Sequence, residues 1–247
     1  MDGWPYPRWI AHRGAGKLAP ENTLAAFRLG ASHGYRMFEC DVKLSADDVP
    51  FLLHDATLER TSNGKGDARG LDWLALSKLD AGSWHSAAYA GEPLASLEKI
   101  ARYCLENSFF LNIEIKPTPG LEGPTGTAVA NAAASLWPAG VTPPLLSSFQ
   151  AASLQAARHA QPQLPRALLL DSLNPGWLDT ALQLECAAVV CNYRLWNELT
   201  VRQAREAGLR TLCYTANESA AVQQMLALGL DGIITDQVHV FKPDDTQ

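Results

Sequence analysis

Three acidic residues stand in segments that have the pattern of strands. Glu39 and Asp41 are two residues apart, and Glu114 has the same spacing to Asn112 and to Lys116. Side chains along a strand alternate between its two faces, so residues two apart point the same way. Carboxylates that meet away from water repel one another and are costly to bury unpaired. A hard divalent cation with oxygen ligands removes that cost.

We therefore expect Glu39, Asp41 and Glu114 to hold one divalent cation. A set of oxygen ligands without histidine or thiolate favours Mg²⁺ or Ca²⁺, and Mn²⁺ is also compatible. The alternative is that these acids pair only with arginine or lysine side chains, and the spacing alone does not decide between the two.

Two histidines follow short apolar runs and have charged neighbours. His12 is followed by Arg13, and His54 is followed by Asp55. An imidazole titrates near neutral pH, so a pair of histidines can supply one general acid and one general base. His12 and His54 are therefore candidates for such a pair, without an assignment of which starts as the base. The residues alone leave open whether they are catalytic or ordinary packing histidines. The remaining histidines have no such setting and are expected to be surface or packing residues: His33, His85, His159 and His239.

Arg13 and Lys116 are the cations that stand beside these candidates. Arginine binds a phosphoryl group through two parallel hydrogen bonds, and lysine acts as a point charge. Both could offset the negative charge of a phosphodiester and the charge that develops as it reacts. Each could also neutralise a neighbouring carboxylate, and the two roles are compatible in the empty enzyme.

Short apolar runs alternate with helical patterns along the chain. Such alternation is typical of βαβ units and a parallel sheet. A (β/α)₈ barrel takes about 250 residues and carries its active site at the carboxyl ends of its strands. The expected strands are Trp9–Ala11, Arg36–Val42, Val49–Leu53, Phe109–Ile115, Leu145–Ser148, Arg166–Leu170, Ala187–Cys191, Arg210–Tyr214 and Gly232–Thr235. The expected helices lie near residues 21–33, 97–107, 123–136, 150–160, 175–184, 199–207 and 218–228.

One of these apolar runs cannot be a parallel barrel strand. Only Ser45–Asp48 separates Val49–Leu53 from the run before it, whereas a parallel crossover needs about a dozen residues. The two runs are therefore expected to form an antiparallel hairpin, which leaves eight parallel strands. A four-residue loop would pair Leu44 with the first residue of the returning run. It would then place His54 opposite Glu39, where side chains are about 5 Å apart.

The 247 residues are expected to form one α/β domain, a (β/α)₈ TIM barrel over 1–247. The stretch 55–95 comes after the second barrel strand and fits neither strand nor helix. Long irregular loops are uncommon and often functional, so we interpret this stretch as a small insertion that caps the barrel mouth. Its Asn63-Gly64-Lys65-Gly66 run lacks the strand–loop–helix setting of a phosphate loop and indicates a plain turn.

The composition excludes several classes of protein. The net charge is −6 and 47% of residues are hydrophobic, with no basic stripe for nucleic acid and no basic amphipathic helix for stable membrane association. Neither a secretory leader nor an apolar run of about 18 residues is present, so we expect a cytoplasmic protein. The five cysteines, with no CxxC pair, indicate reduced buried thiols. The oligomeric state is left open.

Several motifs follow one another in a recognisable order. The ordered set resembles the glycerophosphodiester phosphodiesterase family along nearly the whole chain. No single motif is specific, whereas five in order at fitting strand ends are. These five are His12-Arg13-Gly14, Pro20-Glu21-Asn22-Thr23, Glu39-Cys40-Asp41, His54-Asp55 and Glu114-Ile115-Lys116. Further matches are Thr57-Leu58-Glu59-Arg60-Thr61, Ser148-Phe149 and Gly232-Ile233-Ile234-Thr235-Asp236.

The resemblance implies a (β/α)₈ barrel with a small insertion after the second strand. It implies metal-dependent hydrolysis of glycerophosphodiesters, deacylated phospholipids such as glycerophosphocholine and glycerophosphoethanolamine, to sn-glycerol 3-phosphate and an alcohol. The substrate is therefore expected to be a small molecule. The implied roles are metal binding by Glu39, Asp41 and Glu114, acid–base catalysis by His12 and His54, and phosphate binding by Arg13 and Lys116.

Two positions depart from the pattern of the resembled family. Tyr214 stands where the family often carries a tryptophan, so an aromatic wall is expected to remain and Tyr214 is a candidate substrate-binding residue. The other departure is the stretch Glu92-Pro93-Leu94-Ala95-Ser96-Leu97, where Pro-Thr-Leu is commoner, and we expect that change to affect the insertion rather than the chemistry.

Other readings of the same site remain open. Related barrels act on inositol phospholipids or lysophospholipids, or as phospholipase D, and would use the same groups on a different substrate. A non-catalytic binder of phosphodiesters is a further alternative, although no histidine or metal ligand is missing. Aldolase chemistry through Lys116 would need a depressed lysine pKa, which the nearby acids oppose. The sequence also leaves open whether water or the glycerol 2-hydroxyl is the nucleophile.

Overall fold

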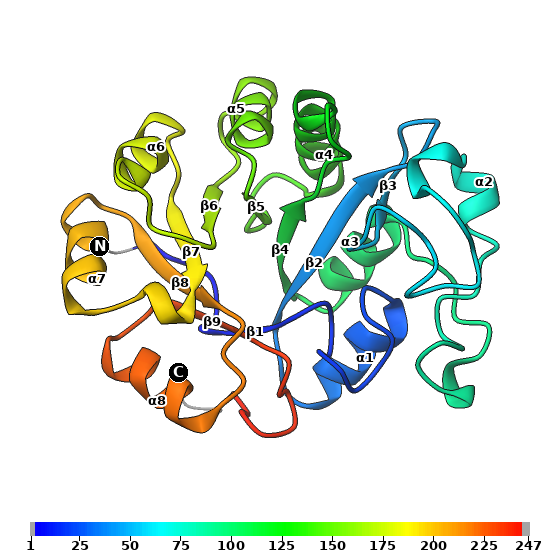
Figure 1. The fold of residues 1–247 in the computed structure, drawn as a ribbon, viewed down its shortest axis with the longest axis horizontal. Coiled ribbons are helices and arrows are strands. Elements are labelled where there is room, and N and C mark those ends of the chain that lie inside the picture. The colour runs from blue at the N-terminus through cyan, green and yellow to red at the C-terminus, as the bar shows by residue number, and fades with distance from the viewer. Residues whose placement is uncertain (1–2, 244–247) are drawn as a thin grey trace.

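Eight parallel strands form a closed barrel with helices around its outside (Figure 1). The computed structural model describes residues 3–243. The sheet order is β1-β9-β8-β7-β6-β5-β4-β2-β3, and pairing of β1 with β2 closes the barrel and leaves β3 outside it. The strands are β1 (Trp9–Ala11), β2 (Met37–Leu44), β3 (Pro50–Leu52), β4 (Phe110–Ile115), β5 (Leu145–Ser148), β6 (Arg166–Leu170), β7 (Ala188–Asn192), β8 (Arg210–Tyr214) and β9 (Gly232–Thr235). The helices are α1 (Leu24–Ser32), α2 (Trp73–Leu76), α3 (Leu97–Glu106), α4 (Glu122–Leu136), α5 (Ala151–Ala160), α6 (Trp177–Gln183), α7 (Glu198–Glu206) and α8 (Ser219–Ala227).

The predicted (β/α)₈ TIM barrel is confirmed, and so is the antiparallel hairpin of β2 and β3. The predicted register of that hairpin is wrong by one residue. Leu44 pairs with Pro50, not with Val49, because Ser45 bonds back to Val49 and shortens the loop to three residues. Asp48 makes this possible by adopting a left-handed conformation (φ 61°), which short polar side chains tolerate. His54 therefore lies beyond the end of β3 rather than in register with Glu39.

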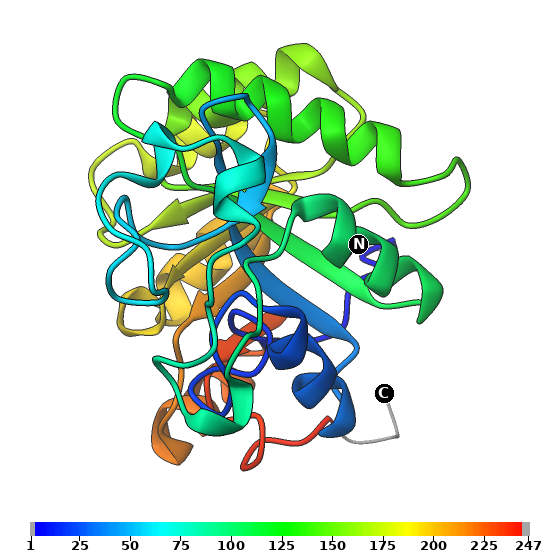
Figure 2. The same ribbon diagram turned by 90° about the vertical axis from the view of Figure 1, so that its right-hand side faces the viewer.

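The segment 55–95 packs beside the barrel, against the β2–β3 hairpin and α1 (Figure 2). Its backbone joins the hairpin where Ala46 donates to Leu71, and Arg69 donates to the carbonyl of Ser45. Glu92 accepts a hydrogen bond from the first turn of α1. The segment includes α2 and two short 3₁₀ helices, Ala68–Gly70 and Ala87–Tyr89.

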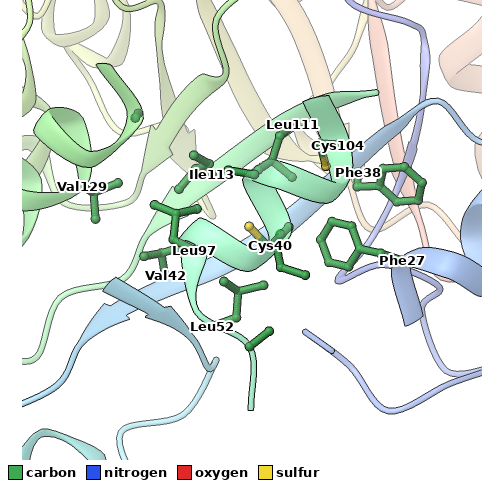
Figure 3. Packing of buried hydrophobic residues seen from close by; sticks show 14 of the residues in the cluster. Phe27, Phe38, Cys40, Val42, Leu52, Leu97, Cys104, Leu111, Ile113 and Val129 are labelled. Carbon is green, nitrogen blue, oxygen red and sulfur yellow. The ribbon is translucent and has the colours of Figure 1, made fainter. Parts of the chain in front are cut away.

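The outer face of β2 explains why its acids point inward. Phe38, Cys40 and Val42 are buried and pack beneath α3, where Leu97 and Cys104 meet them (Figure 3). Because side chains alternate along a strand, this apolar face forces Glu39 and Asp41 into the barrel. Burying these apolar side chains stabilises the fold by roughly 1.5–3 kcal/mol each, so the strand cannot easily turn over.

The cap and the apolar stripe of the α3 helix suit its position on the outer face of β2. Ser96 caps it by accepting a hydrogen bond from the backbone of Lys99, and Glu98 stands in its first turn, where the helix dipole favours an acid. Its buried residues recur at helical spacing and form one apolar stripe: Leu97, Ile100, Ala101 and Cys104.

Two expectations about composition can be compared with the structure. All five cysteines are free and buried, as expected for thiols that pack rather than react. Within residues 3–243, none of the helices has the length and apolar character needed to cross a lipid bilayer.

Candidate active site

The carboxyl ends of the barrel strands surround a cavity of 210 Å³. Active sites of this fold occur at that end. Seven of the eight sequence-predicted site residues line the cavity, and the eighth, Asp41, contacts two of them, Arg13 and Lys116. The lining residues are His12, Arg13, Glu39, His54, Asn112, Glu114, Lys116, Phe149, Leu169, Tyr214, Thr215 and Ile234.

The three predicted metal ligands meet inside the barrel. Glu39, Asp41 and Glu114 each offer an oxygen atom, and these atoms lie within 4.8 Å of one another. The parallel pairing of β2 and β4 brings them together, because Asp41 is in register with Glu114. Such a set could bind a divalent cation.

The partners of these acids also fit a cation. Asp41 is fully paired, since Arg13 Nε lies 3.1 Å and Lys116 Nζ 3.2 Å from its two oxygens. Glu39, in contrast, is 3% exposed and its Oε1 atom has no hydrogen-bond partner. A buried carboxylate oxygen without a donor is costly, and a cation would remove that cost. The pairing of Asp41 with Arg13 and Lys116 therefore leaves Glu39 without such a partner, and the cluster could still bind a cation.

The pKa values of the acids reflect this uneven pairing. Burial and the neighbouring Asp41 charge raise the pKa of Glu39 to about 8. Burial and Asp41 also raise the pKa of Glu114, although Lys116 opposes the shift. Burial acts in the same direction on Asp41, but Arg13 and Lys116 outweigh it and hold the pKa of that carboxyl well below its usual range.

Arg13 is placed by an unusual turn after β1. Its φ is 50°, and Gly14 follows with a φ of 100°. A Cβ atom on Gly14 would come within 2.9 Å of the α1 backbone at Ala26 and Phe27, so only glycine fits here. The turn directs the Arg13 backbone N–H to Glu39 Oε2 (3.0 Å) and its guanidinium to Asp41.

Each predicted catalytic histidine is held by a carboxylate. His12 Nδ1 is 2.6 Å from Asp236 Oδ1, and His54 Nδ1 is 2.6 Å from Asp55 Oδ1. These bonds leave Nε2 as the nitrogen for proton transfer, and His12 Nε2 lies 3.8 Å from Glu39. A carboxylate on one ring nitrogen fixes the tautomer and orientation of an acid–base histidine.

The pKa values of the two histidines move in opposite directions. Burial opposes the charge on His12, but the hydrogen bond to Asp236 and the charge of Glu39 outweigh it and raise its pKa. Burial lowers the pKa of His54, although Asp41 and Asp55 partly offset the shift. The two imidazoles therefore differ in proton affinity, which suits a pair that divides the acid and base roles.

Comparison with known proteins identifies the family to which this arrangement belongs. The model of the glycerophosphoryl diester phosphodiesterase family matches residues 12–240. The chain belongs to that family. It is therefore an enzyme of the phosphodiesterase class, as the motif order in the sequence indicated.

Relatives of the phosphodiesterase cover nearly all of its length. The glycerophosphodiester phosphodiesterase of Caldanaerobacter subterraneus is 31% identical, over 92% of this chain and 93% of that protein. Bacillus subtilis YhdW is 35% identical over 92% and 93% of the two chains. An Oleispira antarctica phosphodiesterase, solved in complex with the product sn-glycerol-3-phosphate, is 32% identical with a TM-score of 0.89, covering 94% of this chain and 93% of that one.

Several residues that organise the phosphodiesterase site were not assigned roles from the sequence. Asn22 donates from Nδ2 to Asp41 (2.8 Å) and accepts from the Asp41 backbone, so its side chain fixes that acid. Asn217 donates to Asp236 and thereby supports His12 from behind. Asn22 and Asp236 belong to family motifs already visible in the sequence, so motif position was the available signal. Asn217 had none.

Tyr214 forms part of the cavity wall in this phosphodiesterase. Its ring meets Phe149 edge to face, with ring centroids 5.7 Å apart. Its hydroxyl donates to the carbonyl of Leu170 (3.1 Å), so that group is already paired, and Tyr214 contributes its ring to the wall. The aromatic wall expected from the sequence is present.

Arg60 links the insertion to both halves of the phosphodiesterase site. Its guanidinium donates to both oxygens of Asp55, which holds His54, and to both oxygens of Glu21. Glu21 in turn accepts from Arg13 (2.8 Å). One side chain thus fixes the partner of a histidine and the partner of a phosphate-binding candidate.

We expect Arg60→Gln to lower kcat by about 10- to 100-fold, the usual range for a residue that orients a functional group. Stability should change little, because the side chain is 44% exposed and such pairs contribute at most about 1 kcal/mol. Steady-state kinetics measured across a range of pH would check this prediction. If Asp55 is no longer held in place, the part of the pH–rate profile that is set by the pKa of His54 should also shift. Arg60→Lys should recover part of the rate, and Arg102→Gln, which breaks an exposed ion pair on α3, should have no effect. An unchanged kcat and pH profile in Arg60→Gln would refute a positioning role.

Proposed function

We propose that the protein is a metal-dependent glycerophosphodiester phosphodiesterase. Its substrates are deacylated phospholipids such as glycerophosphocholine and glycerophosphoethanolamine, and its products are sn-glycerol 3-phosphate and an alcohol. One observation carries the proposal: two acids of a clustered triad, one of them with an unpartnered carboxylate oxygen, line the same cavity as two carboxylate-held histidines.

In this proposal Glu39, Asp41 and Glu114 hold one divalent cation, Mg²⁺ or Ca²⁺, which matches their all-oxygen ligand set. When bound, such an ion would supply Lewis-acid stabilisation of the negative charge on the phosphate. Binding of the ion would also displace the proton that Glu39, with a pKa of about 8, holds at neutral pH in the metal-free protein.

Arg13 and Lys116 bind the phosphate in the proposed complex. Both line the cavity and both are anchored by acids, Arg13 by Glu21 and Lys116 by Glu114 (3.0 Å). Burial acts to lower the pKa of both side chains, but the neighbouring carboxylates outweigh it and raise both pKa values, so both groups remain charged at neutral pH. Fixed cations at the place where charge develops contribute to transition-state stabilisation.

His12 and His54 share the proton transfers. One removes a proton from the nucleophile, which is water or the 2-hydroxyl of the glycerol, and the other gives a proton to the departing alkoxide. The Nδ1 bonds to Asp236 and Asp55 stabilise whichever imidazole carries the positive charge. Attack by the 2-hydroxyl would release a cyclic glycerophosphate before water opens it.

The products distinguish this function from its rivals. The protein would be incubated, in the presence of Mg²⁺ or Ca²⁺, with one of four substrates: glycerophosphocholine, glycerophosphoethanolamine, glycerophosphoinositol or lysophosphatidylcholine. The products of each reaction would be identified by ³¹P NMR. We expect sn-glycerol 3-phosphate from the deacylated substrates, and an early 1,2-cyclic phosphate signal if the 2-hydroxyl attacks. Release of lysophosphatidic acid as the preferred product, or turnover of no glycerophosphodiester, would overturn the proposal.

A further inference from the structure

One polar side chain in the cavity takes no part in the proposed binding of metal and phosphate or in the proton transfers. Asn112 stands on β4 and is 1% exposed, yet neither its Oδ1 nor its Nδ2 atom has a hydrogen-bond partner. Burying an amide without partners costs stability. Polar groups of this kind are rarely left unsatisfied unless a ligand or water completes them.

The surroundings of Asn112 place it at the floor of the site. It lines the cavity together with the apolar side chains of Leu169 and Ile234. It is in register with Glu39 across the β2–β4 pair, one step below the pair of Asp41 and Glu114. An apolar residue at position 112 would avoid the cost of burying an unpaired amide. The presence of the amide therefore indicates that it binds a group that enters the cavity.

The chemistry around Asn112 identifies the group that it suits. Its amide offers an acceptor and two donors side by side, and neither kind of atom has a partner. A phosphate oxygen carries no proton, so it could accept from Nδ2 but would leave Oδ1 unpaired. The hydroxyl groups of an alcohol can both donate to Oδ1 and accept from the amide N–H, so an alcohol matches the amide.

We propose that Asn112 binds a hydroxyl of the glycerol moiety and so selects glycerol phosphodiesters over phosphodiesters of simple alcohols. The proposal rests on the proposed function, since it assumes that the phosphate lies at Arg13 and Lys116. A site that hydrogen-bonds a substrate hydroxyl rejects analogues that lack it, because the buried polar groups then stay unpaired. Asn112 would thus set specificity, while the acids and histidines carry the reaction.

The test is a thermodynamic cycle with two changes. One change removes the hydroxyl groups from the ligand, and the other removes the amide of Asn112 from the protein. Dissociation constants of sn-glycerol 3-phosphate and propyl phosphate would be measured by calorimetry, at fixed Mg²⁺, for the wild type and Asn112→Leu. We expect the wild type to bind sn-glycerol 3-phosphate at least about 10-fold more tightly than propyl phosphate. In Asn112→Leu the two constants should agree within about 2-fold, with propyl phosphate binding retained.

Ser147→Ala is the matched control. Ser147 stands on β5 in register with Glu114, and its Oγ atom is also buried without a partner, but it does not line the cavity. Its loss should leave the ratio of the two constants unchanged. Because leucine removes unpaired polar atoms, the Tm of Asn112→Leu should be equal to or above that of the wild type. If the leucine variant fails to fold, Asn112→Ala replaces it in the cycle.

The outcomes separate the inference from the function beneath it. A wild-type ratio that survives in Asn112→Leu, or an equal loss of affinity for both ligands, overturns the role of Asn112 even if glycerophosphodiesters are hydrolysed. A wild type that hydrolyses no glycerophosphodiester removes the proposed function, and the cycle then measures only hydroxyl recognition. Collapse of the ratio in Asn112→Leu, with the ratio kept in Ser147→Ala, supports the inference.

Discussion

Replacing either His12 or His54 with alanine is expected to lower kcat by at least about 100-fold and to leave KM within a few-fold of the wild type. A positioned general acid or base contributes about 10²- to 10⁴-fold. Each imidazole lines the cavity and is held at Nδ1 by a carboxylate 2.6 Å away. The remaining cations would still bind the phosphate, so the loss should fall on the chemical step rather than on binding.

An activated substrate would divide the two roles. A glycerophosphodiester with a p-nitrophenol leaving group needs no proton on departure, so the variant that lacks the general acid should recover most of its rate. The variant that lacks the base should not. His159→Ala is the control, because His159 is exposed on α5 and contacts only Gln155 among the contacts described. Near-normal turnover of glycerophosphocholine by either histidine variant would remove that residue from the pair.

Glu39→Gln is expected to abolish hydrolysis, by about 10³-fold or more, and to alter how stability depends on pH. The substitution keeps the shape of the side chain but removes the charge that a cation would neutralise, so metal binding and charge stabilisation should both be lost. Metal affinity by calorimetry and turnover at saturating Mg²⁺ would measure the two effects. Glu98→Gln, on the exposed side of α3, is the matched control.

The effect on stability follows from the raised pKa of Glu39. In the folded, metal-free protein this carboxyl has a pKa of about 8 against an ordinary value of 4.5, because of burial and Asp41. Between these values the folded state holds a proton that the unfolded state has released. The contribution of Glu39 to the free energy of unfolding of the metal-free protein should therefore be largest below about pH 4.5. It should fall as the pH rises toward 8.

Glu39→Gln has no proton to lose and should flatten that dependence. Urea unfolding in EDTA at pH 5 and pH 8 would test this, with the wild type losing more stability across the interval than the variant. Equal losses in both proteins would show that Glu39 does not carry the shift. Metal affinity of the wild type should change in the opposite direction and strengthen as pH rises, because the cation must displace that proton.

Much of this site could be predicted because it depends on the regular alternation of side chains along a strand and on the regular topology of the barrel. Strand alternation assigned Glu39 and Asp41 to one face, and the apolar outer face of β2 enforces that choice. The shortness of the link after β2 excluded a parallel crossover and set the number of barrel strands correctly. The clustering of charged residues at strand ends then followed from the barrel itself, since every parallel strand ends at the same rim.

What could not be predicted depends on single residues outside that regularity. The hairpin register was wrong because it turned on the backbone conformation of Asp48, which sequence spacing does not specify. Arg60 joins Asp55 to Glu21, which stands 39 positions before Arg60 in the chain, and only the folded insertion brings them together. Asn217 likewise reaches Asp236 through the packing of two strand ends. Asn112 was visible as a polar residue on the inner face, but its lack of partners could be seen only in the structure.

The most direct measurement is the rate of glycerophosphocholine hydrolysis as a function of bound metal. Protein would be stripped with EDTA, its metal content verified by mass spectrometry, and Mg²⁺ or Ca²⁺ then added back stepwise. We predict no turnover in the stripped protein and recovery that saturates at one ion per chain, with no recovery in Glu39→Gln. Full turnover by protein shown to contain no metal would contradict a cation held by Glu39, Asp41 and Glu114.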